Sequence, residues 1–520
     1  MHAQIQDLYR RYQRLLRERA PWDEAWRQLS RHFLPMRYRA AQDAARVNKP
    51  MLNRDMVDAT GIFALRTLAA GMQGGMTSPA RPWFRLAPDD ADLTGSRAAR
   101  LWLDTVTERM RIVFHRSNFY NAMHALYAEL GAFGTGLLYE LADERDGFRF
   151  ITCTAGTYVL DCDEQERVDT VFRRVFMTAR QLRLAYGREC LPERLPDAWN
   201  AGGEERYAVI NAVFPRQERN PRSLDAPHMP WASISWLEGC EGQTLPLRES
   251  GFVSFPAFGP RWDVLQGDVY GHSPAMDALP DCRMLQQMGI STLKAIHKSV
   301  EPPMSVSAAL KNAGLDLTPG GINYVETMQG QSPLAATPLL QIKPEIAQAR
   351  AAMESVQNQI KTGLYNDLFR IILNGRNNVT ATEIAAREEE KIILMGPTLE
   401  RLHSELFIPL IDRTFMLMLR LNMLPPCPPE LCGQRLKVEF VSLLAQAQKL
   451  VCTGAVDQYV NFTATAGRIW PEATDAVDID ALMDKYAEYL GLEIALLRPQ
   501  EERNLLRDAR RLQCLQQPSA

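Results

Sequence analysis

Several short patterns carry side chains that could do chemistry, but none completes a known catalytic arrangement. Gly271-His272-Ser273-Pro274-Ala275 lacks the second glycine of a nucleophile elbow, so Ser273 is interpreted as a turn or helix start. No HExxH or GxSxG pattern occurs. No Gly-Lys dipeptide occurs either, so the standard phosphate-binding loop cannot be formed. The sequence therefore predicts a protein that is not an enzyme and does not hydrolyse nucleotides by itself.

The segment GAFGTG, Gly131 to Gly136, superficially suggests a dinucleotide-binding loop. It falls where a helical pattern passes into a strand pattern, whereas such a loop passes from strand to helix. No helix N-terminus would then face a phosphate. We interpret the segment as a helix C-cap followed by a turn.

Metal and cofactor sites are not predicted. Oxygen-rich acidic loops could bind a hard cation, but such loops are usually only solvated. The acidic residues concerned are Asp89, Asp90, Asp161, Asp163 and Glu164. The nine cysteines are scattered without a CxxC pair, which favours free thiols in a reducing compartment. Cys427 and Cys432 flank a proline-rich turn, and no second ligand pair follows at zinc spacing.

Length and charge define the broad class of the protein. With 520 residues, 46% of them hydrophobic and 23% charged, the chain is globular, and two to four structural units are expected. A formal net charge of -3 disfavours tight binding of nucleic acid, so any DNA contact should be local or weak. No uncharged apolar run is long enough to span a membrane, so a soluble, unsecreted protein is expected.

Hydrophobic spacing predicts an α+β fold that is mainly helical. One apolar stripe before Pro21 and another after it indicate two amphipathic helices at the start of the chain. From about residue 135 to 260, short runs rich in β-branched and aromatic residues indicate a β-rich module. The runs are TGLLYEL, FRFITCT, VDTVFRRVFM, ERYAVINAVF and WASISWLE.

Two helical segments then flank an irregular insertion. The first, 281–300, ends before Glu301-Pro302-Pro303, and the second covers 344–368. Each is about 30 Å long at 1.5 Å per residue, which predicts a two-helix stalk with a compact tip. On the first segment Met284, Met288 and Leu293 could pack while Lys294 and Lys298 face elsewhere.

A third helical region follows a Gly/Asn loop. Thr380 and Glu383 form a capping box at the start of a helix. Pro397 and Pro409 should kink or break this helix, because proline removes a backbone donor. A last helical part is expected from about 443 to 512.

Three ordered motifs carry a family resemblance. FYNAMHALYAELGAFGTGLLYE, GDVYGHSPAMDALPD with the following KSVEPP, and NNVTATEIAAREEEKIILMGPTLERLHSELFIPLIDR resemble portal proteins of short-tailed, T7-like bacteriophages, also called head-to-tail connectors. The similarity spans most of residues 1 to 425. It implies a dodecameric ring at one capsid vertex, which acts in viral capsid assembly, viral genome packaging and DNA ejection.

The resemblance also implies regions of the portal fold. These are a wing (1–280), a first stem helix (281–300), a clip (301–343), a second stem helix (344–368), a channel loop (369–379), a kinked wing helix (380–425), and a helical crown with the C-terminal tail (426–520). No cofactor and no membrane are implied. The implied partners are further copies of the chain, double-stranded DNA, a terminase motor, tail adaptor and nozzle proteins, and major capsid and scaffold proteins. The implied locations are the virion, at the portal vertex, and the host cytoplasm during assembly.

Site residues follow from these regions. The residues expected to face the channel and DNA are Asn374, Gly375, Arg376, Asn377, Asn378, Lys294, Lys298 and Lys361. Those expected to dock the motor or the adaptor are Leu315, Thr318, Gly320, Gly321, Asn323 and Tyr324. Two alternatives stay open: a tail or capsid ring protein without DNA contact, and a metal-dependent nuclease that uses the acidic loops.

Overall fold

The computed structural model describes about two thirds of the chain, divided into two compact units. The described residues are 2–35, 37, 56–89, 97–143, 147–187, 206–223, 225–239, 246–300, 304–306, 336–338, 346–374, 393–431, 433–434, 436–442, 444, 459–460, 462–466, 468, 470, 477–483, 498 and 502–509. The first unit comprises Met1–Gly74, Glu108–Asn374 and Pro397–Pro426. The second comprises Gly75–Thr107, Gly375–Gly396 and Cys427–Ala520.

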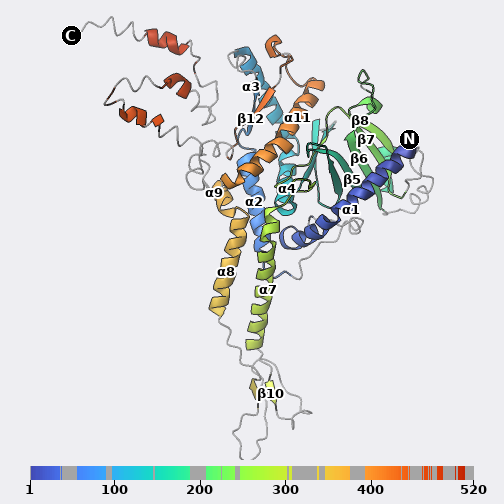
Figure 1. The fold of residues 1–520 in the computed structure, drawn as a ribbon, viewed down its shortest axis with the longest axis vertical. Helices are drawn as coiled ribbons and strands as arrows, with labels where there is room; N and C mark the ends of the chain where they lie inside the picture. Colours follow the sequence, from blue (N-terminus) through green and yellow to red (C-terminus); the bar gives the residue numbers. More distant parts are fainter. Residues whose placement is uncertain are drawn as a thin grey trace, which may run out of the picture. The chain divides into compact units, whose positions relative to one another are not determined.

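Helices and strands are both present, which confirms the predicted α+β class (Figure 1). The helices are α1 His2–Phe33, α2 Thr60–Met76, α3 Arg97–Arg116, α4 Phe119–Phe133, α5 Ala179–Tyr186, α7 Pro274–Val300, α8 Ile346–Gly363, α9 Asn366–Asn374 and α11 Ile408–Arg420, with short helical turns η2 Ala226–His228, η4 His403–Phe407 and η5 Pro429–Leu431. The strands are β1 Phe84–Pro88, β2 Leu137–Asp143, β3 Gly147–Cys153, β4 Tyr158–Cys162, β5 Val168–Thr178, β6 Arg206–Pro215, β7 Trp231–Leu237, β8 Arg248–Phe252, β9 Ala257–Phe258, β10 Met304–Val306, β11 Ala336–Pro338 and β12 Leu436–Phe440. None of the described helices is long and apolar enough to cross a membrane.

The β-rich module of the first unit contains two antiparallel sheets. One has the strand order β4-β5-β6-β7-β8 and the other β3-β2-β9. The five sequence runs predicted as strands correspond to β2, β3, β5, β6 and β7. The shorter strands β4, β8 and β9 and the helix α5 were not predicted, because they offer too few residues for a periodic pattern.

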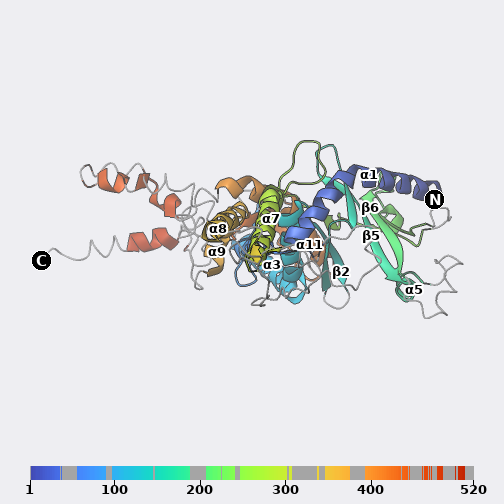
Figure 2. The ribbon, with the colours of Figure 1, turned by 90° about the horizontal axis from the view of Figure 1, so that it is seen from below.

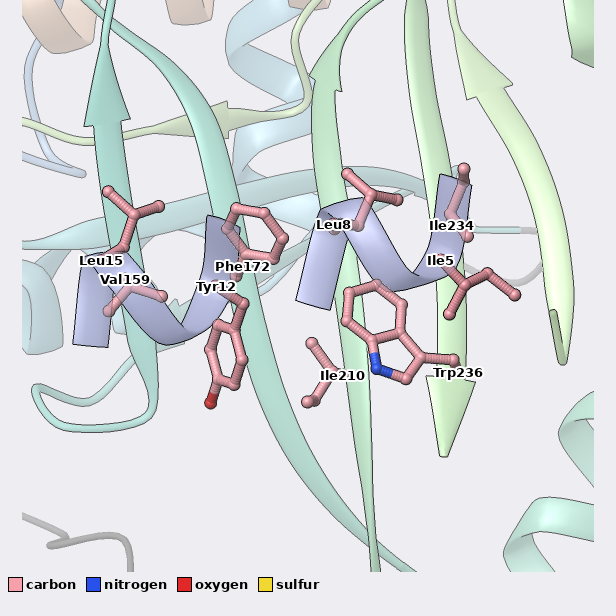
Figure 3. Packing of buried hydrophobic residues seen from close by; sticks show 10 residues of the cluster. Ile5, Leu8, Tyr12, Leu15, Val159, Phe172, Ile210, Ile234 and Trp236 are labelled. Carbon is pink, nitrogen blue, oxygen red and sulfur yellow. The ribbon is translucent and has the colours of Figure 1, made fainter. Parts of the chain in front are cut away.

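Helix α1 covers one face of the five-stranded sheet (Figures 2 and 3). Its apolar stripe packs on side chains from β4 to β7, including Phe172 and Trp236. The prediction of two helices separated at Pro21 was wrong, because α1 is continuous through that proline. Beyond it, Trp26 is fully buried and its Nε1 donates to the carbonyl of Phe133 at 3.1 Å. Burial on both sides of Pro21 thus outweighs the one hydrogen bond that the proline removes.

The C-terminus of α4 is held by a close contact between two glycines. Gly134 caps the helix with a left-handed φ of 75°, which confirms the C-cap interpretation of GAFGTG. A Cβ on Gly134 would lie 2.1 Å from the carbonyl oxygen of Gly271, and one on Gly271 would lie 2.4 Å from the oxygen of Gly134. Thr135 Oγ1 accepts a hydrogen bond of 2.7 Å from the Gly271 amide. Two of the three sequence motifs therefore meet at this joint.

The third motif ends in an irregular helix. Residues 393–402 are helical through Pro397, so the break expected at that proline is absent. Residues His403–Phe407 form a π-helical turn, and α11 follows with Pro409 in its first turn. The expected irregularity at Pro409 is thus a π turn on its N-terminal side, where a proline cannot supply a donor. Thr380 and Glu383 lie outside the described residues.

The second unit contains a strand pair that the sequence did not predict. β1 and β12 pair antiparallel, from Phe84 opposite Phe440 to Pro88 opposite Leu436. The amide of Val441 extends the pairing by donating to the carbonyl of Trp83 at 3.1 Å. The C-terminal region was expected to be helical, so β12 is a correction. The described residues beyond it include only short helical pieces.

The glycine joint predicts a large cost for one added methyl group. Gly134→Ala would place a Cβ against the Gly271 backbone and also require left-handed backbone, which alone costs about 1–2 kcal/mol. We expect a loss of more than about 4 kcal/mol in the free energy of unfolding, measured by urea denaturation.

Gly147→Ala is the matched control. Gly147 has a φ of 79°, but no atom lies within 4 Å of its added Cβ. This variant should lose only the conformational cost of about 1–2 kcal/mol. Equal losses in the two variants would show that the contact between Gly134 and Gly271 is unimportant.

Candidate functional site

Helix α7 starts at the glycine joint. Ser273 Oγ accepts a hydrogen bond of 3.1 Å from the Met276 amide and donates one of 2.9 Å to the Ala132 carbonyl. This confirms Ser273 as a helix start. The predicted first stem helix therefore begins earlier than residue 281, because α7 continues through Pro280.

Helices α7 and α8 lie side by side and run in opposite directions (Figures 1 and 2). α7 has 27 residues and is about 40 Å long, while α8 has 18 residues and is about 27 Å long. The face of α7 that is buried within the chain consists of small and medium side chains, including Ala278, Cys282 and Gly289. The expectation that Met284 and Leu293 pack is not met within the chain, because they are 44% and 46% exposed. The interior positions lie on a different face of the helix.

Residues 57 and 58 clamp the two helices together. Gln286 Oε1 on α7 accepts hydrogen bonds from the amides of Val57 at 2.8 Å and Asp58 at 3.1 Å, and its Nε2 donates to the Asp58 carbonyl. Gln357 Nε2 on α8 donates to Asp58 Oδ2 at 2.9 Å. Between the helices, a Cβ on Gly289 would lie 2.9 Å from Val57. The clamp thus needs two glutamines and a position without a side chain.

The second predicted stem helix is interrupted. It was expected to run from 344 to 368, but α8 ends at Gly363 and α9 begins at Asn366. Tyr365 between them has a φ of 54°, which an α-helix cannot contain. Asn366 is 4% exposed and Leu368 is fully buried, so packing fixes the new helix direction on the far side of the break.

The structure separates the predicted channel lysines into two places. Lys294 and Lys298 are exposed and lie one turn apart on α7. Lys361 lies on α8, where its Nζ is 3.4 Å from Asn358 Oδ1. Gly289 on α7 and Met353 on α8 lie at the same height along the helix pair. From this height, Lys294 lies about 8 Å along the axis towards the C-terminal end of α7. Lys361 lies about 12 Å in the opposite direction, towards the N-terminal end of α7. These lysines do not form one cluster within the chain.

The other predicted site residues have little or no described structure. Asn374 is the last residue of α9. Gly375, Arg376, Asn377 and Asn378 lie outside the described residues, as do the docking positions Leu315, Thr318, Gly320, Gly321, Asn323 and Tyr324. The described part of the predicted clip is the antiparallel pair β10 and β11.

Two buried ion pairs lie in the first unit, one of them beside the loop before α7, and no sequence pattern indicated either of them. Arg261 is 4% exposed; its Nη2 donates to Glu405 Oε1 at 2.7 Å and to the carbonyl of Glu166 at 2.7 Å. Its backbone amide also donates to Glu405 Oε2 at 2.9 Å. Burial lowers the pKa of Arg261, but the hydrogen bonds and charge of Glu405 outweigh burial, so the pKa is raised. Glu405 lies in the π-helical turn η4, so this ion pair links η4 to the loop that precedes α7.

The second buried pair lies between β2 and α11. Arg413 Nε is 3.5 Å from Glu140 Oε2, and Thr414 Oγ1 donates to Glu140 Oε1 at 2.7 Å. Burial raises the pKa of Glu140 to about 7, although Arg413 and Thr414 lower it. Among the described residues, no three His, Cys, Asp or Glu side chains are grouped so that they could hold a metal ion.

Comparison with known proteins gives extensive matches. The sequence matches the family described as bacteriophage head to tail connecting protein over residues 5–497. A probable portal protein of Bordetella phage BPP-1 is 40% identical over 507 residues, which is 97% of this chain and 90% of that relative. The portal protein of Salmonella phage epsilon15 is 34% identical, with the same coverage of 97% and 90%.

Solved structures also match, at low identity. A chain in the virion of a native gene transfer agent particle is 10% identical and has a TM-score of 0.34, with 84% of this chain and 90% of that chain covered. A chain in the neck of an empty particle of the same kind has a TM-score of 0.36 at the same identity and coverage.

The clamp at residues 57 and 58 predicts a specific loss of stability. Gln286→Leu removes the acceptor of two backbone amides at an exposed to half-buried position, where the loss of a hydrogen bond costs about 0.5–1.5 kcal/mol. We expect that loss in the free energy of unfolding, measured by urea denaturation. Gln287→Leu is the control, since Gln287 is exposed and, among the described residues, its side chain hydrogen-bonds only to Ser291, at 3.4 Å. This variant should change the free energy of unfolding by less than about 0.5 kcal/mol.

Proposed function

The chain belongs to the family of bacteriophage head-to-tail connecting proteins and has the structural role of a portal protein; we propose that twelve copies form a ring at one vertex of the capsid. The channel of this ring would pass DNA during packaging and ejection. The observation that carries the proposal is the match to portal proteins along almost the whole chain.

The paired helices α7 and α8 support a ring with a helix-lined channel. An arm of two antiparallel helices, repeated by rotation, makes a tube, and head-to-tail contacts between unlike faces close such a ring. Met284 and Leu293 are apolar and exposed on α7, so an adjacent copy could cover them. A net charge of -3 fits a channel that must release DNA, because each lysine or arginine bound to phosphate strengthens the grip.

The channel residues follow from this ring. We place Lys294, Lys298 and Lys361 on the helix arm and Asn374 to Asn378 on a loop at the channel wall. Arg376 would supply one phosphate-seeking charge per copy, while the asparagines would hydrogen-bond without a fixed charge. Gly375 would let the loop adapt as DNA passes.

The remaining partners are assigned to the ends of the ring. We place the terminase motor and the tail adaptor and nozzle proteins at the clip, 301–343, through Leu315 to Tyr324. Scaffold and major capsid proteins would surround the wing, and assembly would take place in the host cytoplasm before the portal becomes part of the virion.

Electron microscopy of the purified full-length protein tests the ring. We expect hollow rings with twelve-fold symmetry. A monomer that cleaves DNA only with a divalent cation would instead support the nuclease alternative. Assembled particles in which crosslinking finds the protein next to tail or capsid subunits, but never next to DNA, would support a ring without DNA contact.

The channel assignment predicts a packaging defect without an assembly defect. Arg376→Ala and the double variant Lys294→Ala/Lys298→Ala should form rings and enter capsids, but their particles should hold less than the full length of DNA. The reason is the loss of phosphate contacts in the channel. DNA per particle is measured by gel electrophoresis of extracted genomes.

Arg350→Ala is the control for the channel variants. Arg350 is exposed on α8 and pairs with Glu354 at 3.3 Å within the helix, so its loss removes a charge without changing the proposed contacts. Full-length genomes in the particles of all three variants would contradict the channel assignment.

The docking assignment predicts a separable loss of partner binding. Replacement of residues 315–324 by a Gly/Ser linker should leave ring formation intact, because α7, α8 and the glycine joint lie outside the replaced segment. We expect the rings to lose adaptor binding in a pull-down assay. Adaptor binding equal to that of unmodified rings would exclude this segment as the docking site.

A further inference from the structure

An open pocket of about 330 Å³ lies between the C-terminal half of α1 and α7. Its lining contains no hydrophobic side chain: the residues are Glu24, Arg27, Gln28, Arg31, His32 and Arg283. None of them belongs to the predicted channel or docking residues. Small-ligand pockets are usually lined mainly by hydrophobic side chains, so a polar lining rich in arginine suits a charged ligand rather than an apolar one.

The pocket carries a positive charge. Three arginines and one glutamate give a formal charge of +2 with His32 neutral. Glu24 is already engaged, because its two oxygens accept from Arg27 Nη1 and Gln28 Nε2. Among the described residues, Arg31 and Arg283 have no carboxylate partner. Two guanidinium groups are therefore available to an anion.

His32 adds a second, independent feature. Its Nδ1 is shielded from solvent and has no hydrogen-bond partner within the described part of the chain. Burial lowers the pKa of His32, and the charges of Arg283 and Arg31 lower it further. The imidazole is thus neutral near pH 7 and keeps one N-H that could donate to an oxyanion.

Stabilisation of a helix end does not explain the whole cluster. Arg31 and His32 lie in the last turn of α1, where positive charge interacts favourably with the helix dipole. Arg283 comes from α7, far along the sequence, yet its charge reaches the same imidazole. Bringing like charges together costs free energy unless an anion compensates them.

We propose that this pocket binds a phosphate group, held by the guanidinium groups of Arg31 and Arg283 with His32 as a further donor. Guanidinium forks match the oxygens of phosphate with two parallel hydrogen bonds each. The phosphate could belong to a free phosphate or nucleotide, or to the DNA backbone. The net charge of +2 matches a phosphate dianion.

The test measures binding to purified full-length protein and to two variants. Inorganic phosphate, adenosine monophosphate and a short double-stranded DNA are titrated separately by isothermal calorimetry at low salt. Arg283→Gln and Arg31→Gln should each weaken binding at least tenfold. Arg10→Gln is the control, because Arg10 is exposed on the same helix α1, pairs with Asp7 at 3.3 Å and does not line the pocket.

The probes distinguish the two sources of phosphate. Binding of inorganic phosphate or adenosine monophosphate that both pocket variants weaken, while Arg10→Gln binds normally, supports a free phosphate or nucleotide as ligand. Binding of DNA alone with the same pattern supports a backbone phosphate. Absence of binding by all three probes, or equal binding by pocket and control variants, would overturn the proposal. Circular dichroism spectra that match the unmodified protein confirm that the variants fold.

Discussion

The close approach of Gly134 and Gly271 is the constraint on which the first unit depends. At this point the end of α4, the start of β2 and the loop before α7 come together, and neither glycine leaves room for a side chain. The amide of Trp262 donates to the Gly134 carbonyl at 2.8 Å, and Thr135 bonds to Gly271, so the contact is also hydrogen-bonded on both sides. The direction in which α7 leaves the unit follows from this joint. That direction determines the position of the arm formed by α7 and α8, and of the pocket between α7 and α1.

Among the described residues of the first unit, the buried side chains of Arg261, Glu129 and Glu140 are paired with an opposite charge or have a raised pKa. Arg261 and Glu405 form a multiply bonded pair, which is the arrangement that limits the cost of desolvating two ions. Burial raises the pKa of Glu129 to about 8 and that of Glu140 to about 7, so the folded protein holds these protons more tightly than the unfolded chain does. Their contribution to stability is therefore fullest at acidic pH and declines as pH rises from about 4.5 through 7 to 8.

Local patterns in the sequence predicted much of this fold, while contacts between distant residues did not follow from it. The longer strands were predictable because β-branched and aromatic runs mark a pleated, half-buried surface. Gly134 was predictable as a C-cap from its position after a helical pattern, but its partner Gly271 was not, since a close approach leaves no periodic signal. The helix break predicted at Pro21 was wrong because the packing of α1 outweighs the low helix propensity of proline. β1 and β12 are short and far apart in sequence, and the pocket residue Arg283 lies on a different helix from the other arginines, so neither grouping was visible from spacing.

Because α7 is long, the rigidity of its N-terminal end determines how far its C-terminal end can move. A helix about 40 Å long acts as a lever, so a rotation of a few degrees at one end moves the other by several ångströms. The close backbone contact between Gly134 and Gly271 resists such a rotation. The hydrogen bonds of Asp58 with Gln286 and Gln357 hold α8 against α7. Stiffness is therefore concentrated at the base of the lever. The returning helix changes direction at Tyr365, and the burial of Asn366 and Leu368 fixes that change, so a displacement of the arm would be passed on to α9.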